Sequence, residues 1–322
     1  MRKYLLKVAI LLITGLVSAG NAIAFPDKPV TIVVPWPAGG GADYIARFFG
    51  KELSALWKHS VIIENAGGAG SIIGAEKAAR AAPDGYTLML TINGTITSNR
   101  FLYKSLPYDP DKSFVPISLL VQSGQLILLN SSVKADSMKE LVEEIRKHPD
   151  SMSYASYGKG TQPNLMFELL KKREGLELLH VPYKGLAPAL TAVMSNEVQM
   201  TVVSPSSATA ALNSKRAKGI AIGSESRSRM IPGVQTVSEA GFPYMGATIW
   251  FGLFAPSGTP KDIINKVQED IAAIAKKPAF AGQLQERGFD VVAGNSEVFT
   301  AVIQDEVKRT AEMAKAANVK PE

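Results

Sequence analysis

Two glycine-rich loops in this chain carry the residue types best suited to binding an anion. The first is Pro35-Trp36-Pro37-Ala38-Gly39-Gly40-Gly41-Ala42-Asp43, directly before a predicted helix. Its glycines can adopt positive φ and leave backbone N–H groups uncovered at a helix N-terminus, which carries partial positive charge. Such a loop can hold a carboxylate without an arginine. A flexible turn with Asp43 as the helix N-cap explains the same residues equally well.

A second loop of the same kind is Ser156-Tyr157-Gly158-Lys159-Gly160-Thr161. It lies between a predicted strand and a predicted helix, and it offers uncovered N–H groups together with the Ser156 and Thr161 hydroxyls. Two such loops facing across a cleft would hold a small carboxylate from both sides. The pair therefore favours anion binding over the interpretation as a flexible turn.

Motifs for other kinds of chemistry are missing. The chain has no cysteine, which excludes disulfides, thiolate metal sites, a cysteine nucleophile and a lipid-modified cysteine anchor. It has no G-x-S-x-G elbow and no Walker A sequence. The three histidines, His59, His148 and His180, lack metal-ligand spacing. We expect no catalytic residue, no metal and no cofactor.

Two further segments have a functional and a structural interpretation. Gly68-Ala69-Gly70-Ser71-Ile72-Ile73-Gly74 follows a predicted strand, but its G-x-G-x-x-x-G spacing differs from the dinucleotide fingerprint, so a structural turn is favoured. Lys184 could form an imine with a carbonyl substrate. Nothing in the local sequence indicates the desolvation that would activate it, and a turn lysine is the simpler interpretation.

The elements that position these loops follow an α/β pattern. Short β-branched runs alternate with helical patterns, which predicts βα units around a largely parallel sheet. Residues 30–34 are a predicted strand, and Ser137-x-x-Glu140 is a capping box before a helix. Thr259-Pro260 predicts an N-cap and a first helical residue, and a last helix should cover 297–317.

The first 24 residues have the features of an export signal. Arg2, Lys3 and Lys7 precede an apolar run too short to span a bilayer, and Ala22-Ile23-Ala24 is a cleavage sequence. We therefore expect cleavage after Ala24 and a periplasmic mature chain. The leader holds three basic residues and no acidic one, which leaves 32 basic and 29 acidic side chains. This balance and the scattered charges predict no nucleic-acid partner.

Two short segments, at 122–124 and 243–246, are candidates for crossings between domains. If both are crossings, residues 25–122 and 251–322 form one lobe and residues 123–250 form the other. A cleft would then lie between two α/β lobes.

Motifs along the whole mature chain carry a family resemblance. They are Phe25-Pro26-Asp27-Lys28-Pro29-Val30, Gly39-Gly40-Gly41-Ala42-Asp43, Ala82-Pro83-Asp84-Gly85-Tyr86-Thr87-Leu88, Leu106-Pro107-Tyr108-Asp109-Pro110, Ser156-x-Gly158-x-Gly160-Thr161, His180-Val181-Pro182-Tyr183-Lys184-Gly185 and Trp250-Phe251-Gly252-Leu253. In combination they resemble the periplasmic solute receptors of tripartite tricarboxylate transporters, the Bug family. The resemblance implies a two-lobed α/β periplasmic-binding-protein fold, type II-like, that closes on a small organic acid.

The resemblance also implies which residues contact the ligand. In relatives, backbone amides of a loop from each lobe hold a carboxylate in a deep cleft, with ordered waters between. Carried over residue by residue, the ligand-binding set is Ala38, Gly39, Gly40, Gly41, Ala42, Asp43, Ser156, Gly158, Gly160 and Thr161, with Thr95, Tyr183, Gly185 and Ser204 as additional positions.

Two departures from the family pattern bear on the ligand. Relatives often have a His where this chain has Asn164, and an Asp-Asn pair where it has Val203-Ser204. If that position lines the pocket, loss of the acid removes a partner for a ligand amine or hydroxyl, which favours a dicarboxylate or an aromatic carboxylate over an amino acid. The implied receptor is a monomer that delivers its ligand to separate integral-membrane permease subunits. The alternatives are an exported α/β enzyme using Asp43 or Lys184, and a ligand sensor for a signalling partner.

Overall fold

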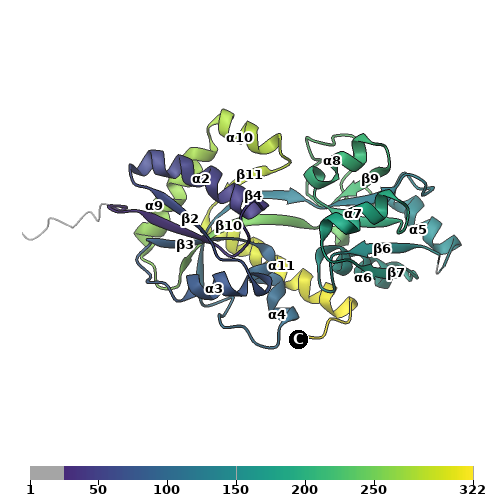
Figure 1. Ribbon diagram of the computed structural model, residues 1–322, viewed down its shortest axis with the longest axis horizontal. Coiled ribbons are helices and arrows are strands. Elements are labelled where there is room, and N and C mark those ends of the chain that lie inside the picture. Colours follow the sequence, from purple (N-terminus) through teal and green to yellow (C-terminus); the bar gives the residue numbers. More distant parts are fainter. Residues whose placement is uncertain (1–24, 150, 322) are drawn as a thin grey trace, which may run out of the picture.

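The computed structural model describes residues 25–149 and 151–321. The expected leader, with its cleavage after Ala24, lies outside the described residues. The described chain forms two β-sheets, each covered by helices on both faces, in the two halves of an elongated molecule (Figure 1).

The first sheet has six strands in the order β11-β4-β10-β3-β1-β2. β1 is parallel to β2 and β3, whereas β10 is antiparallel to β3 and β4, and β11 is antiparallel to β4. In this sheet the expectation of parallel pairing therefore holds only for β1–β3, because β10 enters the sheet from the other half of the molecule. The strands are β1 (Val30–Val34), β2 (Val61–Asn65), β3 (Thr87–Ile92), β4 (Phe114–Gly124), β10 (Thr248–Pro256) and β11 (Asp290–Gly294).

The second sheet has five strands in the order β7-β6-β8-β5-β9. β6 is parallel to β7 and β8, and β5 is antiparallel to β8 and β9. The strands are β5 (Leu126–Asn130), β6 (Ser153–Ser156), β7 (Leu179–Pro182), β8 (Met200–Val203) and β9 (Ala217–Ile222).

Helices cover both faces of each sheet, as apolar residues at helical spacing require. On the first sheet, α2, α9 and α10 pack on one face, and α3 and α11 on the other. On the second sheet, α5 and α6 pack on one face, and α7 and α8 on the other. The helices are α2 (Gly41–Trp57), α3 (Ile72–Ala79), α4 (Asn99–Leu102), α5 (Met138–Lys147), α6 (Gln162–Glu174), α7 (Leu186–Met194), α8 (Pro205–Asn213), α9 (Lys261–Ala275), α10 (Pro278–Gln285) and α11 (Ser296–Ala316), with the short turns η1 (Ala69–Ser71), η2 (Gly94–Ser98) and η3 (Pro243–Met245).

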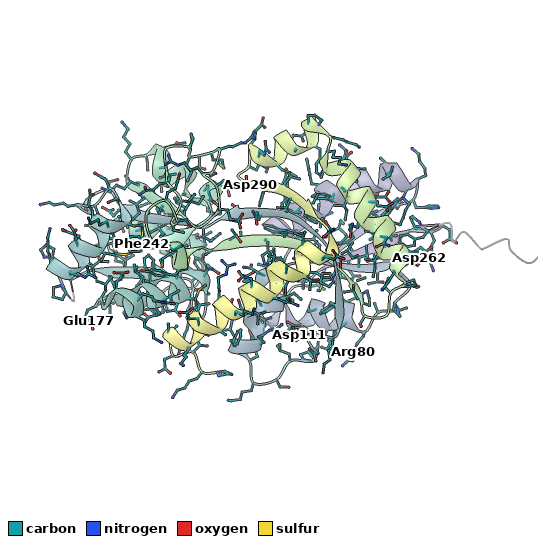
Figure 2. All side chains as sticks on the ribbon, turned by 180° about the vertical axis from the view of Figure 1, so that it is seen from behind. Arg80, Asp111, Glu177, Phe242, Asp262 and Asp290 are labelled. Carbon is teal, nitrogen blue, oxygen red and sulfur yellow. The ribbon has the colours of Figure 1, made fainter. Side chains whose placement is uncertain are left out.

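The chain passes between the two sheets next to the ends of β4 and β10. β4 ends at Gly124 and β5 of the other sheet begins at Leu126, while β10 begins at Thr248, directly opposite Gly124. We propose the lobe bounds 25–122 with 251–322, and 123–250, on this topology. Seen from behind, α11 runs from the half that holds Asp262 toward the half that holds Phe242 (Figure 2), and its end packs on α6 through Met313 and Leu169.

The observed helix start agrees with the predicted one in one case and differs from it in two. Ser137 caps α5, because its hydroxyl accepts the Glu140 N–H at 3.2 Å. The N-cap of α2 is Gly40 rather than Asp43, which lies in the first turn. α9 begins one residue later than expected, since the Thr259 hydroxyl donates to the Pro256 carbonyl instead of capping the helix.

Candidate functional site

A cavity of about 360 Å³ opens where the two sheets meet, and we call it the central cavity. It is lined by residues that follow β1, β3 and β6 and by residues at the two crossings. They are Trp36, Gly70, Ile92, Asn93, Gly94, Ser98, Asn99, Leu102, Tyr103, Gln125, Tyr157, Gly160, Thr161, Gln162, Thr248 and Ile249.

A second cavity of about 470 Å³, the loop cavity, lies against the first glycine-rich loop. Its lining is Trp36, Pro37, Ala38, Gly39, Gly40, Gly41, Ala42, Ile92, Ile249 and Phe251. Both cavities share Trp36, Ile92 and Ile249. They are therefore adjoining parts of one cleft, which reaches from the start of α2 to the second glycine-rich loop.

Asp43 fixes the conformation of the first loop. Asp43 Oδ2 accepts the Gly39 N–H at 2.9 Å, and Arg47 forms an ion pair with the same carboxylate at 2.9 Å. Burial alone would raise the pKa of this carboxyl, but the hydrogen bonds from Arg47 and the Gly39 amide hold the pKa below its ordinary value. The Gly39 amide is thus already used. The first-turn amides of Gly41 and Ala42 have no partner inside the helix and border the loop cavity.

The second loop is closed by hydrogen bonds within itself. The Ser156 hydroxyl accepts the Gly158 N–H at 3.1 Å, and the Thr161 hydroxyl donates to the Gly158 carbonyl at 2.6 Å. The Gly160 N–H donates to Asn164 Oδ1 at 2.9 Å. Of the four residues expected here, the structure places Gly160 and Thr161 in the cavity lining, whereas Ser156 and Gly158 shape the loop behind it.

Asn164 and His180 support the second loop from below. Asn164 also donates to the Tyr154 hydroxyl at 2.9 Å, so its amide is fully engaged inside the lobe. His180 stacks on the Tyr154 ring, and its Nε2 lies 2.6 Å from the Ser156 hydroxyl. Burial lowers the pKa of His180 below its ordinary value of 6.5. Both side chains therefore position the loop and do not line the central cavity.

Thr95 lies inside the η2 turn, away from the cavity surface. It is fully buried, and its hydroxyl contacts those of Thr91 at 2.6 Å and Ser71 at 2.8 Å. Its neighbours Asn93 and Gly94 line the central cavity instead.

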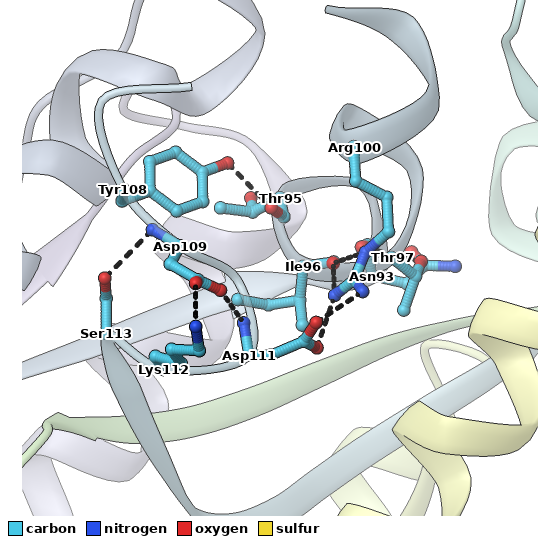
Figure 3. A network of polar contacts seen from close by, with 10 residues as sticks. All are labelled: Asn93, Thr95, Ile96, Thr97, Arg100, Tyr108, Asp109, Asp111, Lys112 and Ser113. Carbon is cyan, nitrogen blue, oxygen red and sulfur yellow. Dashed lines mark hydrogen bonds and ion pairs between the residues drawn. The ribbon is translucent and has the colours of Figure 1, made fainter. Parts of the chain in front are cut away.

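A polar network fixes the η2 turn from its far side (Figure 3). The Tyr108 hydroxyl donates to the Thr95 carbonyl at 2.7 Å. Arg100 donates to the Ile96 carbonyl at 3.0 Å and pairs with Asp111 at 2.8 Å. These contacts hold the segment that contributes Asn93, Gly94 and Ser98 to the cleft.

Tyr183, Gly185 and Ser204 lie outside the central and loop cavities. The Tyr183 hydroxyl donates to Glu197 at 2.8 Å; burial, followed by that carboxylate, raises the pKa of Tyr183 to about 12. Gly185 caps α7, and Ser204 caps α8 by accepting the Ser207 N–H at 3.3 Å. Ser206, two residues on, borders a further cavity of about 420 Å³, which shares residues 39–41 with the loop cavity and is also lined by Glu286 and Arg287.

The sequence interpretation missed most of the cavity lining. Gln125 and Thr248 stand at the crossings, where the chain had only a weak Gly-containing signal. Gln125 is buried and lines the cavity, and its side-chain amide makes no hydrogen bond with any described residue. The many polar residues between Thr91 and Asn99, at the end of β3 and after it, were the available sign of a binding segment.

The linings of the central and loop cavities consist of neutral groups. Neither cavity is lined by a charged side chain among the described residues, and the central cavity offers amides, hydroxyls and three aromatic rings, those of Trp36, Tyr103 and Tyr157. The described residues also contain no group of three metal-ligating side chains. An anion here would be held by backbone N–H groups and side-chain amides, and an apolar ligand body by rings and isoleucines.

Comparison with known proteins gives a family match over most of the chain. The model of the "Tripartite tricarboxylate transporter family receptor" matches residues 45–319. The solved periplasmic binding protein BugD is 33% identical, with 92% of this chain and 100% of that chain covered and a TM-score of 0.73.

Two similar solved structures contain acids. An R. palustris protein with adipate is 28% identical, with 92% of this chain and 100% of that chain covered and a TM-score of 0.78. MatC from Rhodopseudomonas palustris with bound malate is 30% identical, with 90% and 99% covered and a TM-score of 0.72. These likenesses confirm the two-sheet periplasmic-binding-protein fold expected from the sequence.

Proposed function

Because this chain belongs to the tripartite tricarboxylate transporter receptor family, we propose that it captures a small organic acid, a dicarboxylate or an aromatic carboxylate, in the cleft between its two sheets. The family is one of solute-binding receptors and not of enzymes, which agrees with the interpretation that no residue is catalytic. The observation that best supports this proposal is the cleft itself. It has free helix N-terminal amides at one end and neutral amides and hydroxyls at the other.

The ligand class follows from the two ends of the cleft. One carboxylate would meet the Gly41 and Ala42 amides, where the dipole of α2 favours negative charge. The ligand body would lie against Ile92 and Ile249, which both cavities share. A second polar end would reach Gln125. Since no acidic side chain among the described residues lines either cavity, nothing there would balance an ammonium group.

Transport follows from closure of the cleft. An acid that contacts both lobes stabilises the closed arrangement by its differential affinity, and a membrane partner distinguishes closed from open receptor. We propose that integral-membrane permease subunits are that partner, that the exported receptor works in the periplasm, and that it is monomeric. None of the described helices has the length and apolar character needed to cross a membrane.

Native mass spectrometry of protein purified from the periplasm tests the ligand proposal. The expected result is a small acid that adds its mass to the folded protein and is recovered unchanged after denaturation. If the protein bound amino acids and did not bind the corresponding organic acids, the proposed ligand class would be wrong. Recovery of a chemically altered compound would contradict the receptor function itself.

A further inference from the structure

One side chain of the central cavity, that of Asn93, is held in a single orientation by groups behind it. Asn93 Nδ2 donates to the Thr248 carbonyl at 3.1 Å and to Glu306 Oε1 at 2.7 Å. A backbone carbonyl can only accept a hydrogen bond, so the nitrogen end of the amide must face Thr248. Both N–H bonds of Asn93 are thereby used.

Glu306 is itself fixed. Its Oε1 accepts from Asn93, and its Oε2 accepts the indole N–H of Trp250, whose side chain is fully buried. Trp250 lies in β10, and Glu306 lies in α11, so the carboxylate ties the crossing strand to the helix behind it. With one donor on each oxygen, the carboxylate cannot rotate without breaking both contacts.

The free end of the Asn93 amide is its oxygen. Asn93 Oδ1 accepts no hydrogen bond from any described residue. Among the described residues, the side-chain N and O atoms that are both inaccessible and without a hydrogen-bond partner are Asp43 Oδ1 and Ser118 Oγ, so Asn93 Oδ1 is not one of them. Asn93 lines the central cavity, so this oxygen is an acceptor open to a bound molecule. A carboxylate cannot satisfy an acceptor, because it donates nothing when ionised.

We propose that Glu306 and the Thr248 carbonyl orient the Asn93 amide so that its Oδ1 accepts a hydrogen bond from a hydroxyl group of the bound acid. Asn93 then selects hydroxy acids, and Glu306 is the positioning residue for that selection. A hydroxyl fits better than an ammonium because no carboxylate lines the cavity among the described residues. This inference rests on the proposed function, since it concerns the acid held in the same cleft.

The preference for a hydroxyl group can be measured directly with acids that differ at a single substituent. Calorimetric titration compares succinate, malate and aspartate, which differ only in having hydrogen, hydroxyl or ammonium at one carbon, and benzoate with the hydroxybenzoates. The wild-type protein should bind the hydroxyl member of a series about tenfold more tightly than the unsubstituted member, as one net hydrogen bond predicts. Aspartate should bind more weakly than malate.

Two variants and one control distinguish loss of the Asn93 orientation from a general loss of structure. Asn93→Leu removes the acceptor at similar volume, and Glu306→Gln leaves one oxygen for two donors, so both should reduce the hydroxyl preference to about one. Asp305→Asn, an exposed neighbour on α11 that pairs with Arg309, should keep it. The ratio of affinities is the readout, since a purely structural defect weakens both members of a pair alike.

Three results would overturn the inference. They are equal binding of hydroxylated and unsubstituted acids by the wild type, a preference that survives in both folded variants, and aspartate binding as tightly as malate. If the purified protein carries an acid but shows no hydroxyl preference, only this inference fails. If no acid co-purifies and neither series binds, the proposed function fails with it.

Discussion

At the scale of single residues, side chains around the cleft act on the backbone more than on the ligand. Asp43 accepts from Gly39, Asn164 accepts from Gly160, and the Ser156 hydroxyl accepts from Gly158. Each of these acceptors fixes a glycine amide in a loop that would otherwise have many conformations. The sequence shows the glycines, but not which of their amides remain free.

Asp43→Ala should lower the free energy of unfolding by about 1 kcal/mol, because the hydrogen bond from the Gly39 N–H is lost and water replaces it in an exposed loop. Asp43→Asn keeps an acceptor oxygen and should lose less. Urea unfolding measures both, and titration with the co-purified acid should show weaker binding in the Ala variant. An Ala variant as stable as the wild type would contradict the assignment of Asp43 to the loop.

His180 makes stability depend on pH in a predictable direction. Burial lowers its pKa in the folded protein below the ordinary 6.5, so the unfolded chain binds the proton more readily. The contribution of neutral His180 to the free energy of unfolding is therefore fully present above pH 6.5. It is lost as the pH falls through 6.5 toward the pKa of the folded protein.

The corresponding experiment compares melting temperatures of the wild type and His180→Gln as the pH is lowered. The wild type should lose more stability than the variant over that range. Parallel curves for the two proteins would show that His180 does not titrate with folding.

At the scale of elements, η2 is the segment whose rigidity matters most for the cleft. It contributes lining residues on one side and is held by Tyr108 and Arg100 on the other (Figure 3). Tyr108→Phe should cost about 1–3 kcal/mol, since the buried Thr95 carbonyl loses its donor. Chemical denaturation measures the loss. Tyr44→Phe, where the hydroxyl bonds to no described residue, is the matched control and should change stability little.

The elements themselves were largely predictable from the sequence. The strand at 30–34, the Ser137 cap and the last helix rest on local pattern, and they occur within a residue or so of their predicted bounds. The antiparallel return of β10 was not predictable, because it depends on pairing between segments far apart in the chain. Thr95 shows the same limit at the site. The family resemblance implied that it contacts the ligand, but packing buries its hydroxyl against those of Thr91 and Ser71.

The residues that line the cavity at the crossings could not be predicted from the sequence for a related reason. Gln125 and Thr248 have no motif around them, and they meet only because β4 and β10 pair side by side, with Thr248 opposite Gly124. The residue pattern indicated the α/β class and the first loop, and the family resemblance implied the two-lobed fold. It did not give the neutral residues that two distant segments bring together.

At the scale of the whole molecule, the two lobes touch where the second loop meets α4. A Cβ on Gly160 would lie 2.3 Å from Leu102 Cδ2, and both residues line the central cavity. Gly160→Ala should therefore displace Leu102, prevent full closure and weaken ligand binding. Small-angle scattering should show a more expanded protein in the presence of the acid.

Gly175→Ala is the matched control for that variant. Gly175 ends α6 with φ +63, against φ +77 at Gly160, and a Cβ there would meet nothing within 4 Å. Both variants share the backbone strain of about 1 kcal/mol, but only Gly160→Ala should change affinity. Equal affinities in the two variants would contradict a role for this contact in closure.

The absence of charged side chains from the lining of both cavities has a kinetic consequence. Receptors that guide anions with a ring of lysines and arginines capture them quickly in dilute buffer and slowly in salt. Neither of these two cavities has such a ring among its described residues, and in the adjoining cavity Arg287 is matched by Glu286. Stopped-flow measurements should therefore give association rates that depend only weakly on ionic strength.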